Sequence, residues 1–411
     1  MQPIQLDELW TLLAALLTIA LGTAVIKRVP VLARFSLPPA VVGGFLVAVL
    51  LLLLQLAGWK LGFGTQARSA LLLVFFTTLG LTARLSALRG GGVAAAMMAL
   101  AIALLAISQN AVGAGVAWAF GESPALAVFL GSAAFLGGHG TTAAWAGQDL
   151  AAAAGNAFEV GMACATLGLV AGGVLGSVVA TRLLHGAGPA DGQAAALPVS
   201  GEVAPHDDTA SRPFGLWTSS DRWLRQMLVL SMTVALALVW QAALAARGFN
   251  VPPFLACLLT AVVATNLADL LGRRVDLETA DVAGTVALRL FLAMSLMSLD
   301  LAAVARAAGL IISAVVLQCI VTTLIAVTLV RHAAMRGSSG AQRLRDGAVA
   351  AGGFMGFGLG AMPVGLAVMQ RITLQHGAAP RAFLVVTLAA SLVQDLINAG
   401  AVQATLTWAA R

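Results

Sequence analysis

The residues best suited to binding a small anion lie in one glycine-rich segment, GGHGTTAAW, which runs from Gly137 to Trp145. Glycine permits positive φ and close approach of a ligand to backbone amides, and the positive end of a helix that starts here would attract a carboxylate. The alternative is that these glycines serve only close helix packing. The pattern predicts a substrate-binding site made of Gly137, Gly138, His139, Gly140, Thr141 and Thr142.

A second glycine-rich segment, GGFMGFGLGAMP, runs from Gly352 to Pro363. Its glycines alternate with other residues, and Pro363 removes an amide donor just beyond them. An unwound turn here would free carbonyl groups for a small cation such as Na⁺. The alternative is a helix that is only kinked. We predict that Gly356, Gly358 and Gly360 belong to the substrate site and that carbonyls near Gly358 contribute to a Na⁺ site.

Carboxylate and amide side chains inside apolar runs are the candidates for coupling an ion. Asp395 and Asn398, with Gln394 beside them, lie in the last apolar run, and a spacing of three or four residues places side chains on one helix face. A buried carboxylate is costly enough to suggest a function. Glu159 is a second candidate, although it falls close enough to the end of its run to be solvated. The predicted coupling-ion residues are therefore Glu159, Asp395 and Asn398.

Other ionisable side chains allow two interpretations each. His139 can donate to a substrate carboxylate, or it can act as a local hydrogen-bonding residue. Arg289 is a base placed within an apolar run, and it can pair with an anionic substrate or extend to the membrane surface. Asp269 and Asp300 fall near the ends of apolar runs, where we expect water to solvate them.

The composition excludes an ordinary soluble protein. The 411 residues are 60% hydrophobic and 10% charged, with a mean hydropathy of +0.95, whereas soluble domains carry roughly 25% charged residues. The net charge of +6 is therefore read as a topology signal, and no nucleic-acid partner is expected. Cys164, Cys257 and Cys319 lie in apolar runs without disulfide or zinc spacing, so no cofactor is expected.

Repeated apolar runs of about 20 residues, each able to cross a bilayer as a helix, predict an all-α polytopic membrane protein. Two segments, 124–148 and 345–370, are interrupted by glycines, and each is interpreted as a re-entrant hairpin. The predicted full-length spans are 9–26, 38–58, 68–83, 93–120, 155–181, 227–246, 252–271, 283–303, 308–330 and 382–409.

An internal repeat divides the chain into residues 1–184 and 223–411, joined by a polar linker at 185–222 that is rich in Pro, Gly and charge. LPPAVVGGFLVAVL from Leu37 matches VPPFLACLLTAVVA from Val251. FTTLGL and FLAMSL, then FLGGHG and FMGFGLG, match in the same order at nearly constant spacing. Thr166 and Ser391 occupy similar places in the two repeats.

Each repeat holds five predicted spans, with a re-entrant hairpin before the last of them. An odd number of crossings inverts the second repeat relative to the first. Most of the 23 basic residues fall on one side in this arrangement, which favours a cytoplasmic linker and two periplasmic termini. The two hairpins then enter from opposite faces, and their glycine tips approach each other near the midplane.

Five motifs stand out together: LPPAVVGGFL, GGHGTTAAW, EVGMACATLGLVAGG from Glu159, LFLAMSLMSL from Leu290, and GFGLGAMP. With them the sequence closely resembles the sodium/glutamate symporter family over nearly its whole length. The resemblance implies Na⁺-coupled uptake of glutamate across the bacterial inner membrane, two five-span domains of inverted topology, re-entrant loops, and a homodimer with elevator-like movement.

The sequence leaves one alternative transporter function and does not support a channel or an enzyme. The same fold could carry another amino acid or a small dicarboxylate, with Na⁺ or protons as the coupling ion. A channel would need a continuous polar lining, which the spans do not provide. An enzyme is not supported, because His139 has no evident serine or aspartate partner and no HExxH motif occurs.

Overall fold

Long apolar helices dominate the computed structural model, which describes residues 4–29, 32, 38–59, 61–84, 92–148, 151, 154–184, 216–247, 251–272, 276–336 and 340–410. Within these ranges, eight helices are long and apolar enough to cross a membrane, as the composition predicted. They are α1 (Glu8–Arg28), α3 (Pro39–Leu56), α6 (Gly92–Ala119), α9 (Ala157–Leu184), α10 (Leu216–Ala245), α11 (Pro253–Leu270), α12 (Leu277–Leu296) and α14 (Ala308–Ile325), which continues through η3 (Ala326–Val330) and α15 (Arg331–Met335).

Two of the ten predicted spans differ from this set. The span predicted at 68–83 is α4 (Gln66–Thr82), an apolar helix of 17 residues. The final span predicted at 382–409 is not one helix, and that prediction is wrong. The chain turns at Val393 between α18 (Pro380–Leu392) and α19 (Gln394–Ala409). This turn places the polar side chains that follow it in the first turns of a new helix.

Both segments predicted as hairpins are interrupted. The first consists of η1 (Pro124–Val128), α7 (Ser132–Phe135) and α8 (Gly138–Ala146). The second consists of α16 (Gly340–Gly358) and α17 (Met362–His376). The break after α16 falls at Ala361, whose extended backbone (φ −164°) cannot continue a helix. Pro363 then occupies the first turn of α17, where a missing amide donor costs nothing.

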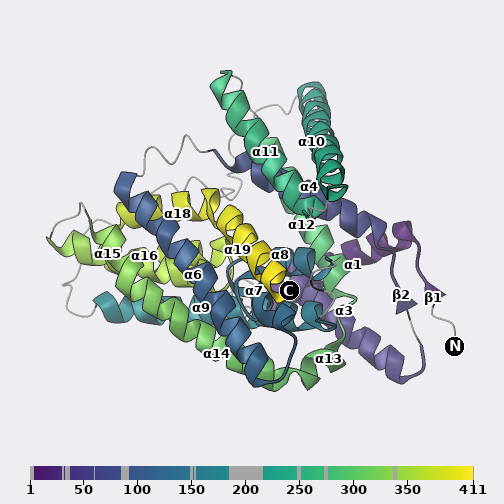
Figure 1. The fold of residues 1–411 in the computed structure, drawn as a ribbon, viewed down its shortest axis with the longest axis horizontal. Helices are drawn as coiled ribbons and strands as arrows, with labels where there is room; N and C mark the ends of the chain where they lie inside the picture. The colour runs from purple at the N-terminus through teal and green to yellow at the C-terminus, as the bar shows by residue number, and fades with distance from the viewer. Residues whose placement is uncertain are drawn as a thin grey trace.

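The helices pack in two groups, which Figure 1 shows on opposite sides of the molecule. Packing between the groups joins α8 to α12 and to Phe254 of α11, whose ring lies 5.1 Å from that of Trp145, and α13 (Leu301–Arg306) links them by packing on both α3 and α9. The support group consists of α1, α3, α4, α10, α11 and α12. The hairpin group consists of α6, η1, α7, α8, α9, α14, α16, α17, α18 and α19.

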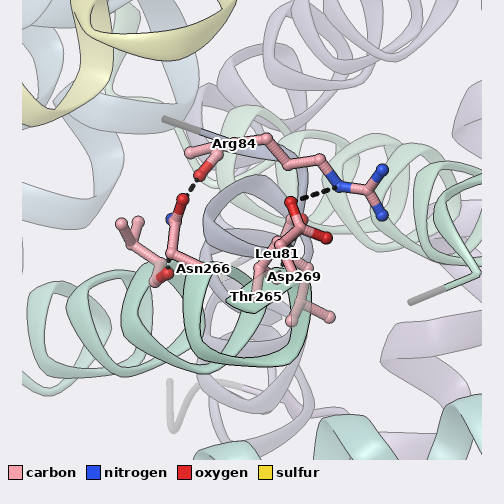
Figure 2. Close-up of polar contacts among 7 residues, drawn as sticks. Leu81, Arg84, Thr265, Asn266 and Asp269 are labelled. Atoms are coloured by element: carbon pink, nitrogen blue, oxygen red, sulfur yellow. Dashed lines mark hydrogen bonds and ion pairs between the residues drawn. The ribbon is translucent and has the colours of Figure 1, made fainter. Parts of the chain in front are cut away.

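The support group is held together across the two halves of the sequence. Figure 2 shows how α11 satisfies the free carbonyl groups at the end of α4. The hydroxyl of Thr265 donates to the carbonyl of Leu81 at 3.0 Å. The side-chain amide of Asn266 donates to the carbonyl of Ala83 at 2.9 Å. The end of α4 is therefore fixed to a helix from the second half.

The acids expected to be solvated near the ends of apolar runs are partly exposed, and each has a partner. Asp269 pairs with Arg84 at 3.5 Å, beside the contacts just described (Figure 2). Asp300 caps α13 by accepting from the amides of Ala302 and Ala303, and it pairs with Arg306 at 3.8 Å. These acids therefore stabilise helix ends.

A short parallel pair of strands, β1 (Ile4–Gln5) and β2 (Leu61–Gly62), lies at the edge of the support group. The linker predicted at 185–222 lies outside the described residues up to position 215, and α10 begins within its range at Leu216.

Candidate functional site

The tips of the two hairpins meet inside the hairpin group. Gly138 has a positive φ of 69°, and a Cβ atom built on it would lie 3.0 Å from the carbonyl oxygen of Gly360. A Cβ atom at Gly137 would lie 2.5 Å from the side-chain nitrogen of Asn398. Three elements far apart in sequence, namely the two glycine tips and the start of α19, therefore converge.

The start of α19 supplies polar groups that lack partners. Asn398 is buried, and neither its amide nitrogen nor its amide oxygen has a hydrogen-bond partner among the described residues. Gln394 donates to the carbonyl of Leu136 at 2.7 Å, while its oxygen is also unpaired in the described part of the chain. Asp395 lies between them and is partly buried. Since unpaired buried amides are unfavourable, these atoms suit a ligand or ion.

The predicted residues of the first tip have different surroundings. The ring of His139 is buried, and its Nε2 lies 2.9 Å from the hydroxyl of Thr166. That hydroxyl donates to the carbonyl of Met162, so it accepts from His139, whose Nε2 carries the proton. This geometry favours the local hydrogen-bonding role over direct contact with a substrate.

The two threonines of the tip differ in their hydrogen bonding. The hydroxyl of Thr142 donates to the carbonyl of Ala133 at 3.1 Å, and its side chain is fully buried. Thr141 is buried, and its hydroxyl has no hydrogen bond to the described residues. Gly140 faces the support group, because a Cβ atom on it would lie 3.3 Å from side-chain atoms of Leu288 and Phe75. Thr141 is therefore the hydroxyl at this tip that a ligand could use.

The second tip is only partly as predicted. The carbonyl of Gly358 accepts from the side-chain amide of Gln109 at 2.8 Å, so this predicted Na⁺ ligand already has a partner. Gly356 packs on the backbone of Gly365 in α17, where a Cβ atom would lie 2.6 Å from its Cα. Gly360 alone of the three predicted glycines lies at the turn that faces the first tip.

Two glutamines that sequence analysis did not single out hold the hairpins from the opposite half of the chain. Gln109 of α6 reaches the second hairpin through Gly358. Gln318 of α14 donates to the carbonyl of Leu130 in the first hairpin and to the backbone carbonyl of Gln109, both at 2.8 Å. Both side chains are fully buried. The sequence signal that could have identified them is an amide side chain inside an apolar span.

We expect Gln318→Leu and Gln109→Leu each to lower the melting temperature of the purified protein. The first change leaves the carbonyl of Leu130 without this donor and the second leaves that of Gly358, at roughly 1–3 kcal/mol for each unpaired group, whereas the carbonyl of Gln109 keeps its partner within α6. Gln55→Leu, at an exposed position near the end of α3, is the matched control and should change little. Equal melting temperatures for all three variants would contradict the anchoring role.

The remaining candidates lie away from the converging tips. Glu159 is partly buried in the first turn of α9, two helical turns before Thr166, and its carboxylate lies near Asp300. Arg289 is exposed on α12 in the support group. The backbone of Ser391 is helical in α18, and its side chain lies outside the described residues.

Comparison with known proteins identifies a family for this chain. The family model described as sodium/glutamate symporter matches residues 4–378. The chain belongs to the sodium/glutamate symporter family. It is 36% identical over 397 residues to the sodium/glutamate symporter of Escherichia coli (strain K12), with 96% of each chain covered. It is 34% identical to that of Haemophilus influenzae (strain ATCC 51907 / DSM 11121 / KW20 / Rd), over 95% of this chain and 94% of the relative.

Membership of this symporter family makes the protein a multi-pass membrane transporter and not an enzyme. The symporter match extends over both halves of the chain, so it includes both glycine tips. The family resemblance found in the motifs is therefore confirmed over nearly the whole length.

Proposed function

We propose that this protein couples the entry of Na⁺ to the uptake of glutamate across the bacterial cytoplasmic membrane. The relatives' names support the cargo and the ion. The observation that carries the proposal is the convergence of two broken segments, Gly138 against Gly360, beside the unpaired amide of Asn398. Backbone amides at such tips bind carboxylates, and unpaired oxygens bind Na⁺.

In this proposal glutamate docks at Gly137 to Thr142, and Na⁺ binds near Asp395 and Asn398. The free hydroxyl of Thr141 and the free amide of Asn398 serve as side-chain ligands. Gly360 closes the site from the second hairpin. Glu159 would act at the entrance of α9 rather than at the tips.

The proposed transport cycle is alternating access, in which the hairpin group moves against the support group like an elevator. One feature supports it: the hairpin group contains both tips, while the support group packs on it mainly through apolar side chains, such as Trp145 of α8 against Phe254 of α11. Helices of each half also pack on helices of the other half: α3 packs on α12, and α11 packs on α4. Packing of this kind is expected of two inverted repeats at 1–184 and 223–411.

The proposal places both termini in the periplasm, the linker in the cytoplasm, and two copies in a homodimer. The distribution of basic residues supports this orientation.

Uptake of labelled glutamate into proteoliposomes tests the function. We expect accumulation when Na⁺ is higher outside, loss of accumulation when K⁺ replaces Na⁺, and strongly reduced Na⁺ dependence in Asp395→Asn. Aspartate, glutamine and succinate as competitors decide between glutamate and another amino acid or dicarboxylate. Uptake that ignores both the Na⁺ gradient and the membrane potential would remove the symport proposal, and uptake driven by a proton gradient alone would replace it.

A further inference from the structure

One face of α12 carries an open polar stripe. Asp281, Thr285 and Arg289 are all exposed, and their spacing of four places them on the same side of the helix. Arg289 is the thirteenth residue of this 20-residue span and has no ion pair among the described residues. Exposing such a side chain to lipid at this depth costs several kcal/mol. The stripe is therefore expected to face water.

The position of the stripe follows from its neighbours on the helix. Leu288, next to Arg289, lies against Gly140 of the first hairpin tip. Further along the same side, Leu296 lies against Gly44 of α3 and belongs to a buried cluster with Met162 of α9. This side of α12 is thus turned toward the boundary between the support group and the hairpin group.

This side of α12 is covered at one end and exposed at the other. All residues from Phe291 to Met297 are buried, whereas Asp281, Thr285 and Arg289 before them are exposed. Side chains in a helix lean toward its N-terminal end, so Arg289 leans toward Thr285 and the exposed end. The covered end of the helix does not offer this side chain a route to the membrane surface.

We propose that the N-terminal half of α12 lines a water-filled vestibule between the two groups. Arg289, at the inner end of this vestibule, attracts the carboxylate of the substrate as it passes between the water and the hairpin tips. This rests on the proposed function for the identity of the anion. The vestibule itself is independent of that function. Arg289 acts here through its charge on the support group, one residue along α12 from Leu288, which lies against Gly140.

Cysteine modification in sealed membrane vesicles tests the vestibule without requiring transport. The Thr285→Cys variant is treated with an anionic and, separately, with a cationic impermeant methanethiosulfonate reagent, each added to one or the other face of the membrane. The unsubstituted protein gives the background reaction. We expect reaction from one face. Adding Arg289→Gln should lower the anionic-to-cationic rate ratio at least about threefold, and Arg289→Lys should restore it.

Val316→Cys, at an exposed apolar position of α14, is the matched lipid-facing control and should react with neither reagent. Three results would overturn the proposal: Thr285→Cys as unreactive as Val316→Cys, a rate ratio unchanged by Arg289→Gln, or a disulfide-linked dimer through Thr285→Cys. A reactive, charge-selective vestibule in a protein that fails to take up glutamate would leave this inference standing and count against the proposed cargo.

Discussion

Gly138→Ala is expected to reduce glutamate uptake by about tenfold or more, while the protein still inserts and folds. Gly138 has a φ of 69° and lies against the carbonyl of Gly360. An alanine in this left-handed conformation costs about 1–2 kcal/mol, and its methyl group adds a contact 3.0 Å from a backbone oxygen that has little freedom to move. Since 1.4 kcal/mol is a factor of ten in an equilibrium constant, the ratio of converged to separated tips falls about tenfold.

The matched control is Gly115→Ala in α6, where a Cβ atom meets nothing within 4 Å. Both variants are purified, checked for monodispersity, and compared in the same proteoliposome assay. Normal uptake by Gly138→Ala would show that the tips are not required to meet at Gly360, and equal losses in the two variants would point to a general effect of removing glycine.

The membrane character and the two breaks could be predicted because their signals are local. Apolar runs long enough for a bilayer specify spans directly, and clusters of glycine specify where a helix is interrupted. Gly138 and Gly360 fall at turns for this reason. The sodium/glutamate symporter family was also recognisable from such clusters together with their flanking residues.

The break at Val393 was not predictable in the same way. No glycine or proline lies near it in the sequence LAASLVQDLIN, so the run looks continuous. The turn places Gln394 where its amide reaches the carbonyl of Leu136, a residue 258 positions away. A contact of this kind depends on how the two halves pack, which a local pattern does not contain.

The glutamine anchors escaped prediction for the same reason. Gln109 and Gln318 look alike from the sequence: each is a polar amide inside an apolar span, with Asn110 beside Gln109. Their partners, the carbonyls of Gly358 and Leu130, are separated from them by 249 and 188 positions. The predicted free carbonyl at Gly358 was therefore satisfied by a donor that only the assembled fold supplies. Asn398 differs, since the fold leaves both of its amide atoms unpaired in the described structure.

Asn398→Leu is expected to abolish Na⁺-dependent uptake while raising, or leaving unchanged, the melting temperature of the protein without ligands. Leucine branches at the same carbon as asparagine, and it removes two buried polar atoms that have no partner among the described residues. Replacing an unsatisfied buried group by an apolar one of the same shape is neutral or stabilising. In the unsubstituted protein, Na⁺ and glutamate should raise the melting temperature, because binding to the folded state stabilises it.

The variant should lose that ligand-induced rise, so stability and function move in opposite directions. Gln394→Leu is the matched control one turn earlier on α19: it removes the hydrogen bond to Leu136, so both its melting temperature and its uptake should fall. A purely structural asparagine predicts the reverse for Asn398→Leu, namely a lower melting temperature with the response to Na⁺ retained. The pair of measurements therefore separates a ligand-binding amide from a packing residue at the point where the two hairpins and α19 converge.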